Sequence, residues 1–255
     1  ASFRLTVATS DNPLRYLAIL AYDGTDFCGW QIQAHGRSVQ GEFERAIEQL
    51  TGHRVRAHAS GRTDAGVHAR QQPAHFDLPL QVDLARLRLA LNAVLPPDLR
   101  VLHVYRVSPA FHSRYSCIEK EYRYFIDNAP VPDPIQRRTR TWERVRLDVR
   151  AMRDAAARLI GRHDFAAFAA NPNREIGGTV RDLRRLDVRR RGSTVEIVAV
   201  ADGFLYRMVR SLAGFLIRVG RRELAPDAAG EILAGRIRTA RVPTAPPQGL
   251  FLWRV

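Results

Sequence analysis

The order in which strand-like and helix-like periods follow one another is the feature of this sequence that most constrains its fold. Residues 14–107 contain period-two and period-3.6 segments in the order β-α-β-β-α-β, and residues 117–255 repeat that order. Two such series predict an α+β protein with two ferredoxin-like halves, whose largely antiparallel sheets are joined side by side. We place an N-terminal extension at residues 1–14, the first half at 15–112 and the second half at 113–255.

Helix signals are the clearest part of this pattern. Residues 38–52 and 83–95 each carry one apolar face, Ser38 and Asp83 stand where N-caps are expected, and Gly52 is a typical helix stop. The second half is expected to hold helices at residues 148–161, 205–220 and 226–235. Strands are expected at residues 14–22, 54–60, 72–78, 100–107, 117–127, 179–190, 193–201 and 249–255.

The chain is strongly basic, with 40 Lys and Arg against 26 Asp and Glu and a formal net charge of +14. Every basic residue except Lys120 is arginine, whose planar fork grips phosphate and stacks on bases. This excess favours a polyanionic partner, most simply nucleic acid. The alternative is a basic protein whose arginines are scattered over the surface and solvated. Its preference for arginine over lysine would then reflect only the base composition of the genome.

No segment approaches the ~18 consecutive apolar residues of a membrane span, and the first residues lack the layout of a secretory signal. Cys28 and Cys117 lie far apart without metal-ligand spacing around either, which is typical of two reduced thiols. We therefore expect a cytoplasmic protein with no membrane contact. No segment signals a protein partner.

The stretch SGRTDAGVHAR, residues 60–70, places one carboxylate, that of Asp64, in a polar loop between two expected strands. Gly61 and Gly66 allow tight backbone conformations around it. Arg62 is two residues away, where an extended chain puts side chains on one face, and its positive charge favours the ionised carboxylate. Such a carboxylate is suited to act as a nucleophile or an electrostatic stabiliser. The alternative is that Asp64 only caps a turn.

No other catalytic motif in the sequence competes with this one. The sequence has no nucleophile elbow, no phosphate loop of the Walker type and no dinucleotide fingerprint. Its eight histidines fall in no metal motif. Asp23 and Asp26, in AYDGTDFCGW, lack the third acid and the closing Glu of a calcium loop, so this stretch predicts a turn that ends a strand.

The phrase GRTDAGVHA resembles the signature of the tRNA pseudouridine synthases of the TruA type. Further stretches resemble that family in the same order: YDGTDFCGWQIQ, SVQGEFERAI, NAVLPPDLRV, FHSRYS, EYRYFI, FLYRMVRSLAGFLIRVG and GLFLWRV. The resemblance runs from about residue 15 to residue 254. Residues 171–182 align poorly with the family, and Glu119 and Glu121 stand where more basic residues are expected.

This resemblance implies isomerisation of uridine to pseudouridine at positions 38, 39 and 40 of tRNA, in the anticodon stem-loop. The C1′–N1 bond breaks, the uracil rotates, and C5 bonds to C1′. Asp64 resembles the family's catalytic nucleophile, which acts on the base or at the sugar. Arg62 resembles the arginine that assists base flipping, the step that takes the uridine out of its stack. The resemblance implies a catalytic cleft between the halves and a homodimer, and it implies no metal or organic cofactor.

Further site residues follow from the same resemblance. Tyr122 resembles the tyrosine that stacks on the uracil. The alternative interpretation of Tyr122 is an ordinary aromatic side chain packed in the core. Arg210 resembles the basic residue that pairs with Asp64, and a buried charge of this kind needs a partner. Leu250 resembles an apolar residue of the uracil pocket, with an ordinary strand residue as the alternative. The RNA-contacting segment comprises Phe111, His112 and Arg114, of which Arg114 is expected on the tRNA backbone.

Two other functions remain open from the sequence. One is a non-catalytic RNA-binding protein with the same basic sheet surface, for which Asp64→Asn leaves every activity unchanged. The other is a pseudouridine synthase of this fold that acts on another RNA.

Overall fold

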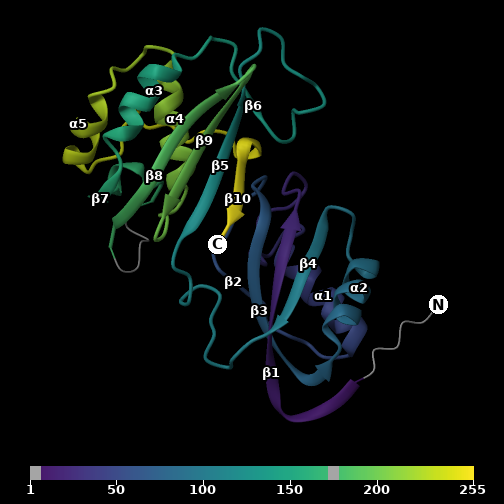
Figure 1. The fold of residues 1–255 in the computed structure, drawn as a ribbon. Coiled ribbons are helices and arrows are strands. Elements are labelled where there is room, and N and C mark those ends of the chain that lie inside the picture. The colour runs from purple at the N-terminus through teal and green to yellow at the C-terminus, as the bar shows by residue number, and fades with distance from the viewer. Residues whose placement is uncertain (1–6, 172–177) are drawn as a thin grey trace. The chain divides into compact units, whose positions relative to one another are not determined.

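The structure, a computed structural model, describes residues 7–171 and 178–255 and divides into two compact units (Figure 1). The first unit holds the residues up to 118 together with 252–255, and the second holds residues 119–251. Both units combine helices with antiparallel strand pairs. This confirms the α+β class with largely antiparallel sheets. Residues 172–177, half of the poorly aligned stretch 171–182, lie outside the described residues.

The first unit has the predicted element order β-α-β-β-α-β. Its strand β1 lies between β4 and β3, and β2 pairs with β3. In chain order the elements are β1 (Val7–Tyr22), α1 (Val39–Thr51), β2 (His58–Ala59), β3 (His68–Val82), α2 (Leu84–Val94) and β4 (Leu99–Arg106).

Three strands of the first unit differ from their predicted lengths, and β3 runs from His68 to Val82 where only residues 72–78 were expected. Strand β1 begins at Val7, inside the segment expected to precede the first strand, because β3 runs on to Val82 and pairs with it there. The strand expected at residues 54–60 is reduced to the two residues of β2, which pair with His75 and Ala74. Strand length depends on partners that a local period does not reveal.

The helices of the first unit begin and end where the sequence predicts. The Ser38 side chain accepts a hydrogen bond from the Gly41 amide, and Gly52 takes the left-handed conformation at the end of α1. Asp83 caps α2 by accepting from the Arg86 amide. The ring of Phe43 on α1 packs edge-on against Phe76 on β3. This helix therefore covers the face of the sheet that β3 presents to the core.

In the second unit β9 lies between β5 and β8, and β7 pairs with the other side of β8. The short β6 pairs in parallel with the end of β5. Its elements are β5 (Lys120–Asp127), β6 (Thr141–Trp142), α3 (Val149–Ala157), β7 (Gly161–Asp164), η1 (Ala166–Phe168), β8 (Val180–Arg191), β9 (Thr194–Ala201), α4 (Met208–Gly220), α5 (Ala228–Gly235) and η3 (Pro247–Gly249). The last strand, β10 (Leu250–Arg254), begins in the second unit and ends in the first.

The second unit departs from prediction at its short elements. Helix α3 ends at Ala157, before the predicted residue 161, and Gly161 then adopts a φ of +118° as β7 begins. Strands β6 and β7 were not predicted, since two to four residues are too few to show a period. The hairpin of β8 and β9 turns at Gly192, as the sequence predicts.

The two faces of the second sheet have opposite characters. Tyr124, Ile197 and Val188 are register neighbours that are almost fully buried, on the face that α3 and α4 cover (Figure 1). On the opposite face Arg123 forms ion pairs with Glu121 and Glu196. This alternation is what a sheet covered by helices on one side requires.

Candidate active site

Asp64 lies half-buried in the loop that connects β2 to β3. Its backbone forms an isolated antiparallel bridge with Gly29, and the neighbouring Thr63 carbonyl accepts from the Trp30 amide at 3.1 Å. The Val67 amide donates to the Asp64 carbonyl at 3.1 Å and closes a turn. The segment after β1 therefore fixes the backbone of the loop that presents the carboxylate.

Two glycines of AYDGTDFCGW make this close approach possible. A Cβ on Gly29 would lie 2.6 Å from the Thr63 carbonyl oxygen, and Gly29 also has a φ of +106°. A Cβ on Gly24 would lie 2.0 Å from the Val67 carbonyl oxygen. The predicted turn after β1 is present, and its backbone packs directly against the Asp64 loop.

Buried polar side chains on the strands of the sheet form hydrogen bonds to the same loop. The Tyr22 hydroxyl is 2.9 Å from the Thr63 hydroxyl. The Gln72 amide donates to the Gly61 carbonyl at 2.7 Å and accepts from the Ser60 hydroxyl at 2.8 Å. Burial raises the pKa of Tyr22 to about 12, so its hydroxyl stays protonated as a hydrogen-bond partner.

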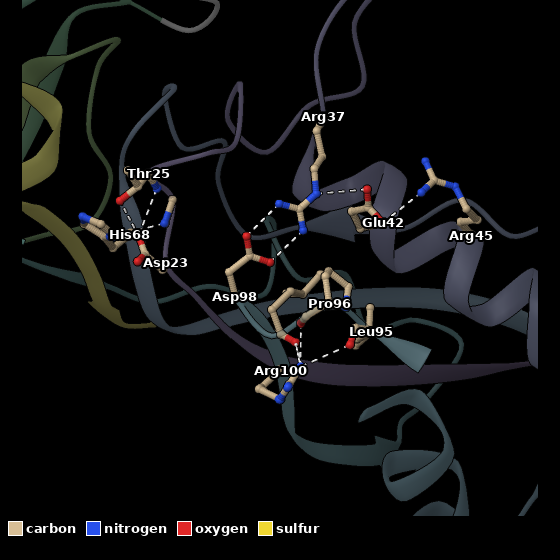
Figure 2. Close-up of polar contacts among 12 residues, drawn as sticks. Asp23, Thr25, Arg37, Glu42, Arg45, His68, Leu95, Pro96, Asp98 and Arg100 are labelled. Atoms are coloured by element: carbon tan, nitrogen blue, oxygen red, sulfur yellow. Dashed lines mark hydrogen bonds and ion pairs between the residues drawn. The ribbon is translucent and has the colours of Figure 1, made fainter. Parts of the chain in front are cut away.

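His68 connects the end of the motif to the turn after β1 (Figure 2). Its Nδ1 accepts from the Gly24 amide at 3.0 Å, and the Asp23 carboxylate lies 3.1 Å from the same nitrogen. The Asp23 carboxylate also accepts from the backbone amide and the hydroxyl of Thr25, so it ties His68 to the turn.

Arg37 fastens the far side of this turn (Figure 2). Its guanidinium donates to both oxygens of Asp98 at 2.7 Å, and it also pairs with Glu42 on α1. The guanidinium carbon lies 4.2 Å from the ring centroid of Phe27. These contacts join Asp98, the residue before β4, to the segment that supports Asp64.

The sequence analysis missed these supporting residues. Tyr22 and Gln72 fall within predicted strands, and His68 lies in the stretch SGRTDAGVHAR, with no sign of what these side chains contact. Their partners lie at least 11 residues away in the sequence, as in the 41-residue separation of Tyr22 and Thr63. The one signal available was the clustering of polar residues at the ends of two predicted strands.

The other predicted residues of the first unit lie at its surface or partly buried. Arg62 and Arg114 are exposed, and Phe111 and His112 are half-buried. The segment of Phe111, His112 and Arg114 packs on β3, where the His112 and His75 ring centroids are 4.6 Å apart. His75 also stacks on His58 of β2, the strand that leads into the Asp64 loop. The loop and this segment thus share their supporting strands.

The second unit carries three predicted site residues, all of them buried. Tyr122 on β5 is 8% exposed and packs edge-on against Phe204 at 5.1 Å between centroids. Arg210 on α4 is 9% exposed, and its Nε donates to the Ala245 carbonyl at 2.7 Å. Leu250 opens β10 and is 5% exposed.

Two glycines allow the backbone to pack closely near these residues. A Cβ on Gly214 would lie 2.1 Å from the Pro243 carbonyl oxygen, and one on Gly249 would lie 2.8 Å from the Phe125 carbonyl oxygen. The chain before β10 is therefore pressed against α4 and β5. This brings the Arg210 side chain into contact with the segment that leads to Leu250.

A family model described as tRNA pseudouridine synthase matches residues 18–116 and 155–255. The chain belongs to this family. Among its relatives is a tRNA pseudouridine synthase A of Moorella thermoacetica, 47% identical over 240 residues that cover 92% of this chain and 96% of the relative. Proteins of the same name from Roseiflexus castenholzii and Geobacillus kaustophilus are 45% and 42% identical, over 95% and 94% of this chain and 90% and 93% of theirs.

Membership of the tRNA pseudouridine synthase family confirms the resemblance seen in the sequence motifs. The two matched ranges contain the Asp64 loop, the segment with Arg114, helix α4 with Arg210, and Leu250. Tyr122 falls between the two ranges. Its family role therefore rests on the EYRYFI motif.

Among residues 7–171 and 178–255, no group of three His, Cys, Asp or Glu side chains is arranged to hold a metal ion. No described helix is long and apolar enough to cross a bilayer. Cys28 and Cys117, both described, are not joined in a disulfide.

Proposed function

We propose that this chain isomerises uridine to pseudouridine in tRNA, at positions 38, 39 and 40 of the anticodon stem-loop. The observation that carries the proposal is Asp64, a carboxylate on a loop whose backbone is fixed by Gly29, Trp30 and Val67 in a chain of this family. A positioned carboxylate suits nucleophilic catalysis because little reorganisation is needed when the base arrives.

Asp64 acts as the nucleophile in this proposal, through the base or at C1′ of the sugar. The glycosidic C1′–N1 bond breaks, the uracil turns, and a C5–C1′ bond replaces it. The C5 proton is lost and N1 gains one, so the reaction needs no oxidant, reductant or co-substrate. The chemistry required of the protein is to stabilise charge and to hold the detached base.

The other proposed site residues assist this chemistry. Arg210 pairs with the Asp64 carboxylate. Tyr122 stacks on the uracil, and Leu250 lines its pocket. Arg62 helps to flip the uridine out of its stack, at the cost of about a few kcal/mol of stacking and pairing. Burial of Arg210 and Tyr122 supports these roles, because both side chains lie in a dry setting where electrostatic and stacking contacts are strong.

Substrate binding and assembly complete the proposal. Arg114 contacts the tRNA backbone, and Phe111 and His112 belong to the same contact segment. The chain works as a homodimer in the cytoplasm, where its tRNA substrate is found. Sedimentation analysis of the purified protein tests the dimer independently of activity.

The decisive experiment incubates the purified protein with unmodified tRNA transcripts and maps pseudouridine by chemical labelling. We expect product at positions 38, 39 or 40 with wild type and none with Asp64→Ala or Asp64→Asn. Asp154→Asn on α3, an exposed carboxylate, is the matched control and should keep full activity. Tight tRNA binding without product from wild type would overturn the enzyme in favour of an RNA-binding protein. Product only in another RNA would overturn the tRNA substrate.

The roles of Arg210 and Tyr122 have their own tests in the same assay. Arg210→Leu should abolish turnover, and Arg210→Lys should retain part of it because the positive charge remains. Tyr122→Phe keeps the stacking ring, so a loss of rate with this variant would show that the hydroxyl takes part. Full activity of Arg210→Leu would remove the proposed pairing with Asp64.

A further inference from the structure

Tyr115 is an unusually exposed aromatic residue of the first unit. Its exposed fraction is 79%, whereas the core tyrosines Tyr16 and Tyr22 are 0% and 4% exposed. The His112 ring lies against it with centroids 4.3 Å apart and planes tilted by 34°. The Arg114 guanidinium carbon lies 5.9 Å from the Tyr115 ring centroid. A wide aromatic surface with a cation beside it is thus presented to solvent.

The turn that carries Tyr115 is closed by its own hydrogen bonds. The Ser116 amide donates to the His112 carbonyl at 2.8 Å, and the His112 amide donates to the Ser116 hydroxyl at 3.1 Å. The His112 Nδ1 accepts from the Arg114 amide at 3.1 Å. The backbone around Tyr115 is therefore fixed before any ligand binds.

Side chains of β1 and β3 also bind the Tyr115 turn to the sheet. Nδ1 of His75, on β3, accepts from the Ser113 amide at 3.2 Å and lies 3.1 Å from the Ser113 hydroxyl. Arg15 on β1 donates to the Phe111 carbonyl at 2.8 Å while it pairs with Asp77 at 2.8 Å. Because the backbone that carries the ring is already fixed, only side-chain freedom is lost when a flat ligand stacks on Tyr115.

We propose that Tyr115 is a stacking site for an unpaired base of the RNA substrate, and that Arg114 contacts the phosphate next to that base. The inference deepens the proposed function and rests on RNA being the ligand. An exposed aromatic face beside a guanidinium is how proteins hold unpaired nucleotides, because every base offers a π-face and every linkage a phosphate. Such a site supplies affinity and register and does not read sequence.

Binding measurements with labelled tRNA test the proposal. Stacking contributes ~1–3 kcal/mol per base, so Tyr115→Ala should weaken binding about 10-fold. Tyr115→Phe keeps the ring and should bind within about twofold of wild type. The matched control is Tyr105→Ala on β4, a 47% exposed tyrosine beside a second histidine, His103, which should also bind normally. Circular dichroism and thermal melting of each variant verify the fold.

Salt dependence separates the two proposed contacts. Loss of a stacked base leaves the slope of log affinity against log salt unchanged, because no phosphate contact is lost. Arg114→Ala should instead reduce that slope by about 1. A hairpin with an unpaired loop should show the Tyr115→Ala loss, and a fully paired duplex should not.

Several outcomes overturn the proposal. Binding by Tyr115→Ala within about twofold of wild type removes the stacking site, and so does an equal loss with Tyr115→Phe, which would point to the hydroxyl. Unchanged tRNA binding with an altered sedimentation mass would assign Tyr115 to a protein interface instead. Pseudouridine formation by wild type is measured on the same preparation. An inactive wild type that still binds tRNA through Tyr115 would refute the proposed enzyme and leave the stacking site intact.

Discussion

At the scale of single residues, the Asp64 loop depends on a glycine that no period in the sequence explains. Gly29 has a φ of +106°, and a side chain there would collide with the Thr63 carbonyl. Gly52 has a φ of +74°, and a Cβ there would meet nothing within 4 Å. The two glycines share a backbone conformation and differ in whether a side chain would displace the loop that carries the carboxylate.

This difference yields a prediction for paired variants. Gly52→Ala should lower the free energy of unfolding by about 1 kcal/mol through its backbone conformation alone, and Gly29→Ala by about 2 kcal/mol or more. Only Gly29→Ala should reduce kcat, because only that change moves Asp64. Chemical denaturation and single-turnover assays measure the two effects. Equal kcat values for the two variants would contradict the role given to Gly29.

His75 gives a second prediction at this scale, on pH and stability. Burial, reinforced by His112, Arg15 and His58 and opposed by Asp77, lowers its pKa from 6.5 to about 4. As pH falls, the unfolded chain therefore takes up a proton at this site before the folded protein does. The stability that neutral His75 contributes is complete above pH 6.5. It declines between pH 6.5 and about 4, by about 3 kcal/mol at ~1.36 kcal/mol per pKa unit.

Unfolding free energies measured across that pH range test this prediction. His75→Asn places an amide oxygen near the Ser113 amide and cannot titrate, so its stability should vary less between pH 6.5 and 4 than that of wild type. The exposed His103 of β4 is the control, and His103→Asn should keep the wild-type profile. A His75→Asn profile parallel to wild type would assign the acid sensitivity to other groups.

At the scale of elements, the sequence predicted helices better than strands, for a physical reason. Helices α1 and α2 have local signals, an apolar face and a capping side chain, and both begin one residue after the predicted cap. Strand β1 extends to Val7 and β2 shrinks to two residues because partner strands decide their lengths. The Asp64 loop was found from its motif. Its supports are Tyr22 at the end of β1 and His68 and Gln72 on β3, and their contacts with the loop depend on how these strands pair.

The capping of α1 can be tested directly. Ser38→Ala removes the acceptor of the Gly41 amide and should lower the free energy of unfolding by about 1 kcal/mol. Ser38→Asp restores an acceptor and places a negative charge at the positive end of the helix, so it should retain wild-type stability. Urea denaturation of the three proteins decides the matter. A stable Ser38→Ala protein would show that tertiary packing alone holds the start of α1.

At the scale of the whole molecule, the sequence predicts the total charge, but it does not predict where the unpaired positive charges lie on the surface. Many arginines are engaged with carboxylates inside a unit, as Arg37 is with Asp98 and Arg123 is with Glu121. Arg62 and Arg114 are instead exposed at or near the proposed site. The formal net charge of +14 is therefore carried by a subset of surface arginines. Sequence alone does not separate that subset from the paired ones, since pairing is set by the fold.

This surface predicts a steep salt dependence of tRNA binding. Each neutralised phosphate releases bound counterions, so about six contacts should lower the affinity about 1,000-fold between 50 and 200 mM salt. Scattered, solvated arginines without a nucleic-acid role predict a nearly flat dependence. Fluorescence anisotropy of labelled tRNA over that range measures the slope, with Tyr105→Ala as a variant that should not change it. A slope near zero for wild type would contradict RNA binding through this surface, because a net charge that meets no phosphate displaces no counterions.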